Sequence, residues 1–328
     1  MNPFGYVRPT DEASARKAAA SPGAECIAGG TGVVDLVRLG VHEPSRLIDL
    51  NALPWAAIEA RPNGALFVGA LVKNSDVAWH PQVRARFPVL SEALLSGASP
   101  QLRNMASVGG NLLQRTRCTY FRDVGVPACN KRKPGSGCAA LDGYVRMHAV
   151  LGGSEHCIAV HPSDMCVALV ALDAVVHVRG SEGERSVPIG DFHVVPGAHP
   201  EVETVLARGE LVSGITLPAT RLAARSAYVK VRDRASYAFA LASAAVALHL
   251  EGGVVRDARI ALGGVATKPW RSREAEQRLI GQAPQRSAFE RAAAAAVEGA
   301  RTRPGNAFKV ALAQRVIVRA LERAGGMA

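Results

Sequence analysis

Short apolar segments alternate with helical apolar spacing over the first fifty residues. Residues 11–20 and 33–39 carry apolar side chains at helical intervals, and residues 25–28 and 46–49 form short segments typical of strands. The strand at 46–49 follows the helix at 33–39 and should lie beside the earlier strand. The pattern therefore predicts a small β-α-β unit at the start of the chain.

The next stretch, up to about residue 220, predicts a larger mixed unit. An amphipathic helix is expected at 82–97, where Val83, Phe87 and Leu90 share one side, and a shorter helix is expected before His80. The other expected elements are a strongly apolar helix at 165–172 and strands at 65–68, 174–179 and 210–217. A linker is expected at 218–225, before the pattern changes.

From Ser226 onward the pattern predicts strands first and helices afterwards. Strands are expected at 228–231, 238–250 and 254–262, with Gly252-Gly253 as the hairpin turn, and helices at 271–280, 288–300 and 307–324. A strand meander followed by helices is typical of a separate α+β domain. We therefore expect a three-stranded antiparallel sheet covered by helices.

Composition and charge limit the functional classes to which the chain can belong. A chain of 328 residues suits two domains, and 48% hydrophobic with 20% charged residues is ordinary globular usage. The net charge of +11 permits nucleic-acid binding, but no basic run with interleaved aromatic residues supports it. Scattered arginines, or docking of acidic subunits, explain the charge more simply.

The sequence predicts neither membrane insertion nor an export signal of its own. No apolar run reaches the roughly 20 residues that span a bilayer. The first residues, MNPFGYVRPT, lack an apolar core followed by a cleavage site. We expect a periplasmic location through co-export with a partner, or a cytoplasmic one.

Two glycine-rich turns are candidate ligand contacts. Gly29-Gly30-Thr31-Gly32 follows a predicted strand and opens a predicted helix, which points backbone N–H groups at an anion. The alternative is a tight turn between packed elements, and the nicotinamide G-x-G-x-x-G fingerprint is not present. Ser107 and Asn111 flank the second turn, Gly109-Gly110, which suits a diphosphate or flavin-edge contact or a simple hairpin turn.

Two charged residues are further candidates. Asp164 follows Ser163 at the start of the apolar helix, where it could be an N-cap, a ligand contact or both. Lys230 lies just after the predicted linker, in a strand that could face the first domain. The ordinary alternative for Lys230 is a solvated lysine.

Four of the six cysteines lie in a region with few apolar side chains. Cys118, Cys129, Cys138 and Cys157 are separated by 10, 8 and 18 residues, and Lys131-Arg132-Lys133 follows the second. The absence of closely paired cysteines disfavours zinc, whereas a cubane iron–sulfur cluster accepts wide spacings. Four unrelated buried thiols are the alternative. A disulfide framework is a weaker interpretation in a chain of this length, and Cys26 and Cys166 are expected to be buried thiols.

Together these residues resemble the FAD-binding medium subunit of the molybdenum hydroxylases, the xanthine dehydrogenase and carbon monoxide dehydrogenase family. Residues 28–32 match the first FAD loop of the family and residues 106–111 match the second. Ser163-Asp164 and residues 228–230 match further flavin contacts, and the C-terminal part looks like the family's flavoprotein domain. The resemblance covers almost the whole chain.

The resemblance implies an α+β fold with two domains. Residues 1–220 would form a PCMH-type FAD-binding domain, similar to vanillyl-alcohol oxidase, with subdomains at about 1–53 and 54–220. The loop at 115–160 would be the iron–sulfur loop. Residues 226–328 would form the carbon monoxide dehydrogenase flavoprotein-type C-terminal domain.

The cysteines narrow the resemblance to members with an extra [4Fe-4S] cluster. Residues 117–122, 127–132, 135–138 and 154–157 look closest to the flavin subunits of periplasmic aldehyde oxidoreductases. The flavin subunit of 4-hydroxybenzoyl-CoA reductase is a more distant relative with such a cluster. One departure is an extra residue or so within 123–128, which should alter the loop shape and leave the ligands in place.

The resemblance also implies cofactors, partners and a role. A large molybdenum-cofactor subunit would oxidise an aldehyde, and [2Fe-2S] clusters of a small subunit would pass electrons to FAD and then to an external acceptor other than NAD. The catalytic substrate site would lie on the partner, and the four loop cysteines would hold [4Fe-4S]. The implied FAD contacts are Cys26, Ile27, Ala28, Gly29, Gly30, Thr31, Gly32, Val33, Val34, Ser107, Gly109, Gly110, Asn111, Asp164 and Lys230.

The same motifs are compatible with other flavoprotein functions. The chain could be the flavin subunit of a xanthine dehydrogenase-like or hydroxybenzoyl-CoA reductase-like enzyme, or a stand-alone flavin oxidase. The cluster would either relay electrons or mainly order its loop.

Overall fold

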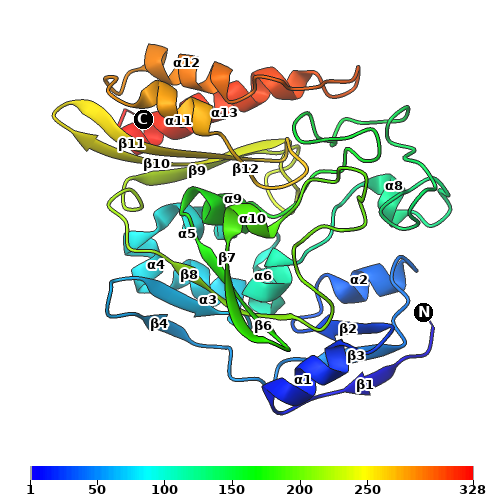
Figure 1. The fold of residues 1–328 in the computed structure, drawn as a ribbon. Coiled ribbons are helices and arrows are strands. Elements are labelled where there is room, and N and C mark those ends of the chain that lie inside the picture. Colours follow the sequence, from blue (N-terminus) through cyan, green and yellow to red (C-terminus); the bar gives the residue numbers. More distant parts are fainter. Residues whose placement is uncertain (1, 328) are drawn as a thin grey trace.

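Three sheets, each with its own helices, organise residues 2–327, the part of the chain that the computed structural model describes (Figure 1). The first is parallel, in the order β1-β3-β2, and consists of β1 (Gly5–Val7), β2 (Ala24–Ile27) and β3 (Arg46–Asp49). Its helices are α1 (Glu12–Ala19) and α2 (Val33–Arg38). The predicted β-α-β unit is confirmed, with β1 as an additional strand.

The middle sheet is antiparallel, in the order β4-β5-β8-β6-β7. Its strands are β4 (Ile58–Ala60), β5 (Leu66–Gly69), β6 (Val175–Gly180), β7 (Gly183–Pro188) and β8 (Leu211–Leu217). Its helices are α3 (Asn74–Trp79), α4 (Pro81–Arg86), α5 (Pro88–Ser96), α6 (Pro100–Met105), α7 (Val108–Leu112), α9 (Asp164–Ala171) and α10 (Ile189–Phe192). A short helix, α8 (Thr119–Arg122), lies in the cysteine region.

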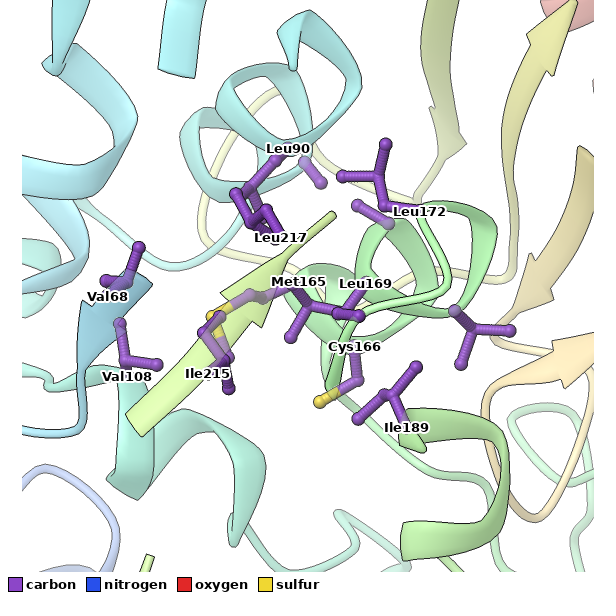
Figure 2. Close-up of a cluster of buried hydrophobic side chains, with 14 of the residues drawn as sticks. Val68, Leu90, Val108, Met165, Cys166, Leu169, Leu172, Ile189, Ile215 and Leu217 are labelled. Carbon is purple, nitrogen blue, oxygen red and sulfur yellow. The ribbon is translucent and has the colours of Figure 1, made fainter. Parts of the chain in front are cut away.

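Helix α9 lies at the centre of the largest hydrophobic core. All eight of its residues are buried, as expected for a helix that is apolar on every side. Figure 2 shows Met165 and Leu169 of α9 among Ile215 of β8, Leu90 of α5 and Val108 of α7. The core therefore fixes the position of Asp164, the first residue of this helix.

The long helix predicted at 82–97 is wrong, because the structure has two helices there. Helices α4 and α5 meet at Phe87, whose φ of −135° and ψ of 53° are not helical. Pro88 restricts the residue before it and lacks the N–H that would continue the hydrogen-bond ladder. The same proline then starts α5 at a position where no N–H is needed.

The third sheet is antiparallel and has four strands, where the sequence predicted three. Its order is β12-β11-β10-β9, built from β9 (Ser226–Val231), β10 (Ala242–Glu251), β11 (Val254–Gly263) and β12 (Trp270–Arg271). The additional strand is a two-residue pairing of Trp270 and Arg271 with β11, too short to show a period of two. The helices are α11 (Arg273–Leu279), α12 (Arg286–Ala295) and α13 (Phe308–Gly325).

Both faces of this sheet are buried. Along β10, Ala244, Val246 and Leu248 pack with α11–α13, whereas Ala245 on the other face joins the core of α9. Small side chains allow helices to approach from both sides. In Figure 1 α11–α13 cover the outer face, and α5 and α9 lie beneath. The predicted α+β class, with a strand meander followed by helices, is confirmed.

Among the described helices, none combines the length and the apolar character that crossing a bilayer requires.

A buried lysine joins α13 to the cysteine region. Lys309 is fully buried, and its Nζ donates to the carbonyl oxygens of His148 at 3.0 Å and Gly264 at 2.6 Å. The neighbouring Asn306 donates to the carbonyl of Ala149 at 3.3 Å. Two side chains of the C-terminal part therefore hold the segment between Cys138 and Cys157, inside the cysteine region.

We expect Lys309 to make stability rise with pH. Burial, with a smaller repulsion from Arg146, lowers the pKa of Lys309 from 10.5 to about 7. Between these values the unfolded chain holds a proton that the folded chain has released, so the free energy of unfolding should increase by about 1 kcal/mol per pH unit above about pH 7. Urea unfolding of Lys309→Met should lack this slope, while Arg319→Met, exposed on the same helix, should keep it. An equal slope in Lys309→Met would contradict the assignment.

Candidate functional site

A cleft of about 780 Å³ lies where the three sheets and their helices meet. Its volume falls in the range of ligand and cofactor sites. Thr31 and Gly32 come from the first glycine turn, Gly110 and Asn111 from the second, and Lys230 from the third sheet. The other polar lining residues are Asp35, Asn74, Arg103, Gln114, Arg117, Thr119, Arg122, Asp123, Asp164 and Tyr237.

The two glycine turns are in direct contact. A Cβ built on Gly29 would lie 1.9 Å from the carbonyl oxygen of Met105, just before the second turn. Gly30 has a φ of +73°, which side-chain-bearing residues rarely adopt. Around Gly32 nothing lies within 4 Å of a built Cβ, so this backbone is open towards the cleft. Gly29 is therefore required by packing, and Gly32 leaves room for a ligand.

This difference predicts two distinct mutant phenotypes. Gly29→Ala should lower the free energy of unfolding by about 2 kcal/mol or more, because backbone atoms must move. Gly32→Ala should leave the stability of the ligand-free chain unchanged and weaken, about tenfold, binding of the FAD that the family resemblance implies, because its methyl group enters the cleft. Urea unfolding and flavin titration separate the two effects, and equal FAD affinity in Gly32→Ala would exclude this backbone as a contact.

The second turn is a short helix, so the hairpin alternative is wrong. The Ser107 side chain caps α7 by accepting from the Gly110 N–H at 3.2 Å. Asn111 accepts a hydrogen bond from the Ser163 hydroxyl at 2.8 Å, and Ser163 in turn caps α9. The chain of caps fixes the second turn relative to Asp164.

Asp164 and Lys230 form a buried ion pair beside the cleft. The Lys230 Nζ lies 2.8 Å from Oδ2 of Asp164 and also donates to the Ser96 carbonyl at 3.1 Å. The Tyr228 hydroxyl donates to Oδ1 at 2.6 Å. Burial, followed by the Asp164 charge, raises the pKa of Tyr228 well above its ordinary value, so this hydroxyl keeps its proton. Lys230 is thus a partnered lysine, and the solvated alternative is wrong.

Arginines supply positive charge to the cleft that sequence reasoning missed. Arg117 and Arg122 both donate to Oδ2 of Asp35, Arg117 at 3.0 Å, and the Arg117 guanidinium lies 5.1 Å from the centre of the Phe239 ring. Burial, with repulsion from Arg122, lowers the pKa of Arg117. Because the residues are far apart in sequence, no local motif signalled this cluster.

Two family models match consecutive parts of the chain. Residues 2–220 match the FAD binding domain in molybdopterin dehydrogenase, and residues 226–324 match the CO dehydrogenase flavoprotein C-terminal domain. The chain belongs to the FAD-binding medium subunits of the molybdenum hydroxylases. It is therefore an oxidoreductase subunit, and the predicted family is confirmed.

Individual relatives and solved structures agree with this medium-subunit assignment. The chain is 49% identical to the aldehyde oxidoreductase FAD-binding subunit PaoB of Escherichia coli K12, over 100% of both chains. It is 28% identical to the carbon monoxide dehydrogenase medium chain of Hydrogenophaga pseudoflava, over 92% of this chain and 89% of that one.

Among solved structures, carbon monoxide dehydrogenase from Hydrogenophaga pseudoflava superposes with a TM-score of 0.77 and 27% identity, over all of both chains. Quinoline 2-oxidoreductase from Pseudomonas putida 86 superposes with a TM-score of 0.76 and 25% identity, over 100% of this chain and 99% of that one.

The medium subunit places its predicted flavin contacts in two groups. Six of them line the cleft: Thr31, Gly32, Gly110, Asn111, Asp164 and Lys230. The other group supports the turns from outside the cleft lining: Cys26, Ile27, Ala28, Gly29, Gly30, Val33, Val34, Ser107 and Gly109. Cys26 lies within β2 opposite Ile48, and burial raises the pKa of its thiol to about 11.

The cysteine region of the medium subunit brings its four thiols together. The Cys129 and Cys138 backbones pair as an isolated bridge, and the Cys157 thiol hydrogen-bonds to Cys138. That hydrogen bond, acting against burial, lowers the pKa of Cys138 to about 6 and raises that of Cys157. Burial raises the pKa of Cys118 to about 11, with smaller contributions from Cys129 and Cys138. Cys118, Cys138 and Cys157 therefore each lie close enough to another thiol of the region for their pKa values to be affected.

Backbone N–H groups lie near three of these sulfurs. The N–H groups of Tyr120 and Phe121 favour the thiolate of Cys118, as those of Ala140, Leu141 and Ile158 do for Cys138. The Ala159 N–H donates to the Cys157 sulfur at 3.4 Å. By contrast, burial raises the pKa of Cys166, outside the region, to about 12, and its only hydrogen-bond contribution comes from Ser163.

Arg132 and Asn130 hold this region in shape. The Arg132 guanidinium donates to the carbonyl oxygens of Tyr120 at 2.5 Å, and of Phe121 and Asp123 at 2.8 Å. Asn130 accepts from the Gly137 N–H at 2.8 Å and donates to the carbonyl of His156 at 3.0 Å. Side-chain to backbone bonds thus replace the regular structure that a segment with few apolar residues cannot form.

Proposed function

We propose that this medium subunit carries FAD and a [4Fe-4S] cluster and transfers electrons in a molybdenum-dependent aldehyde oxidoreductase. The proposal rests on the contact between the flavin cleft and the cysteine region. Arg117 and Thr119 line the cleft on either side of Cys118, and Cys118 and Asp164 line a neighbouring cavity of about 340 Å³. A cofactor in the cleft would therefore contact the wall that the cysteine region builds.

The residues present fit FAD. The open backbone at Gly32 and the N–H groups of the two turns would bind the diphosphate. Arg117 and Arg122 would add positive charge beyond what Asp35 neutralises, because two guanidinium groups share one carboxylate. The flavin supplies the electron chemistry when bound, and the chain binds and orients it.

The buried ion pair would position the flavin end of the site. Asp164 accepts from Tyr228 and Lys230, so its carboxylate is held on two sides and its direction is fixed. Lys230 is 3% exposed at its side chain, which keeps its charge little screened by water. We infer that the pair sets the electrostatic potential next to the cofactor, with Asp164 reducing the net effect of Lys230.

The cysteine region fits a [4Fe-4S] cluster in its donor set. Four sulfurs lie together, N–H groups lie near Cys118, Cys138 and Cys157, and the pKa of Cys138 is lowered. The pKa of Cys118 and that of Cys157 are raised in the metal-free chain, so these two thiols would lose their protons when the irons bind. Lys131 adds positive charge near Cys157. We propose that the cluster orders this region and thereby completes one wall of the cleft, since metal binding contributes to folding.

Similarity to the aldehyde oxidoreductase subunit PaoB supports aldehydes as the substrate class of the assembly. The substrate site would lie on a large molybdenum-cofactor subunit, and a small [2Fe-2S] subunit would deliver the electrons. Because the glycine turns do not form the nicotinamide fingerprint, we favour a quinone, cytochrome or dye-type acceptor over NAD.

An absorption spectrum of the purified chain, with iron and acid-labile sulfide analysis, tests this proposal. We expect flavin bands on a broad iron–sulfur shoulder, with about four irons and one FAD per chain. Flavin without iron after anaerobic purification would remove the cluster from the proposal. Aldehyde oxidation by the chain alone would contradict the subunit role and indicate a stand-alone oxidase.

A further inference from the structure

Two histidines and a cysteine meet outside the flavin cleft and the four-cysteine region. His161 precedes α9, Cys166 lies in the first turns of α9, and His193 follows α10 directly. One ligand atom from each lies within 4.8 Å of the other two. Figure 2 shows the Cys166 side chain leaving α9 beside Ile189, where α10 begins. Three separate segments therefore direct nitrogen and sulfur donors to one point.

The histidines have polar atoms without partners. His193 is 3% exposed, and its Nε2 hydrogen-bonds to the carbonyl oxygen of Leu112 at 2.9 Å. A carbonyl can only accept, so Nε2 carries the proton and Nδ1 presents a bare lone pair. That Nδ1 is buried with no partner, and so is Nε2 of His161. Buried polar atoms without partners are rare and destabilising, which points to a missing ligand.

Each histidine ring contacts a backbone group through one nitrogen. The Leu112 carbonyl accepts from Nε2 of His193 and orients this ring, as metal-binding histidines are usually oriented through their other ring nitrogen. The Ser163 N–H donates to Nδ1 of His161 at 3.4 Å, so the neutral ring carries its proton on Nε2. A cation bound at this Nε2 would move the proton to Nδ1 and replace the long Ser163 contact. The two rings meet edge to face with centroids 4.4 Å apart.

A small cavity gives access to this point. A space of about 210 Å³ is lined by both histidines, by Thr116, Lys131 and Glu203, and by Cys157 of the cysteine region. Three protein donors with a fourth position open to water are typical of accessible zinc sites. Two imidazoles with one thiolate select zinc or another borderline cation over magnesium or calcium, which prefer oxygen.

We propose that His161, Cys166 and His193 bind one zinc-like cation, with the fourth position facing this cavity. The cation would join the segment before α9, the helix itself and the turn after α10. The proposal does not depend on FAD or on the [4Fe-4S] cluster, because none of its three donors belongs to either group of candidate ligands.

Metal analysis of the full-length chain tests the site. Chain exposed to Zn²⁺ and then desalted should retain about one zinc in addition to the iron, and Co²⁺ in its place should give a thiolate charge-transfer band. Cys166→Ser and His193→Gln should each lose the zinc and the band while iron and FAD remain. Cys26→Ser, which alters the other thiol outside the cysteine region, should keep both.

Two further results separate this site from its alternatives. Zinc that persists in Cys129→Ser supports the site, whereas zinc lost there and retained in Cys166→Ser would assign it to the four-cysteine region and overturn the proposal. If Cys166→Ser fails to fold, His161→Gln provides the decisive variant because its ring is only partly buried. Zinc retained at full stoichiometry in folded His161→Gln and His193→Gln would also overturn it.

Discussion

Cys129→Ser is expected to reduce the iron content of the purified chain from about four atoms to nearly none, while FAD content falls less. Cys129 is buried and lies in a small core with Leu36 and Phe121, so a replacement ligand cannot come from solvent. A cubane with one ligand missing is labile, and the region around it has few apolar contacts to keep it folded. Iron analysis and limited proteolysis between residues 115 and 160 measure both effects.

Cys26→Ser is the matched control for this experiment. Cys26 is a partly buried thiol, and it lies in β2, outside the cysteine region. We expect it to retain iron and to show the protease resistance of the original chain. Iron retained at full stoichiometry in Cys129→Ser would remove this residue from the ligand set, and equal losses in both variants would indicate general misfolding.

Lys230→Ala is expected to lower the free energy of unfolding by about 3 kcal/mol and to slow reoxidation of the bound flavin. The substitution leaves the Asp164 carboxylate buried with only the Tyr228 hydroxyl as a side-chain partner. It also leaves the Ser96 carbonyl without its hydrogen bond from Nζ. Urea unfolding measures the first effect, and the flavin midpoint potential with acceptor kinetics measures the second.

A double variant separates stability from electron transfer. Lys230→Met with Asp164→Leu removes both charges, so it should recover part of the lost stability, because replacing a buried pair with apolar groups is often close to neutral. The flavin potential should still be shifted in this double variant, since the local charges are gone. Potential and acceptor kinetics that match the original chain in both variants would exclude the electrostatic role of the pair.

Much of the fold could be predicted because its signals are local. The β-α-β unit, the apolar helix around Met165 and the three C-terminal helices each show a period within a short window. The missed strands, β1, β4, β7 and β12, all lie at sheet edges and are short or largely polar, so they show no apolar period of two. The break at Phe87 had a local signal in Pro88, but the apolar period across it was continuous.

The residues of the candidate site also divide into those with a local sequence signal and those without one. The glycine turns and the four cysteines could be found by residue type and spacing, and Thr31, Gly32, Gly110 and Asn111 do line the cleft. The arginines that meet at Asp35 could not be found in this way, because their side chains come together only after α2 and α8 are packed. His161, Cys166 and His193 were missed for the same reason, since no repeat or spacing relates them.

The Lys309 contacts also limit how hybrids of this chain and its relatives can be built. Its ammonium group donates hydrogen bonds to the carbonyls of His148 and Gly264, and these two residues lie on opposite sides of the boundary near residue 220. A hybrid that combined residues 226–328 with the first part of a relative whose backbone takes another path would keep the Gly264 carbonyl but leave the buried ammonium group without its second acceptor, the His148 carbonyl. The cysteine region and α13 should therefore be inherited together, and an interdomain crossover should succeed only when Lys309 is exchanged with its acceptors.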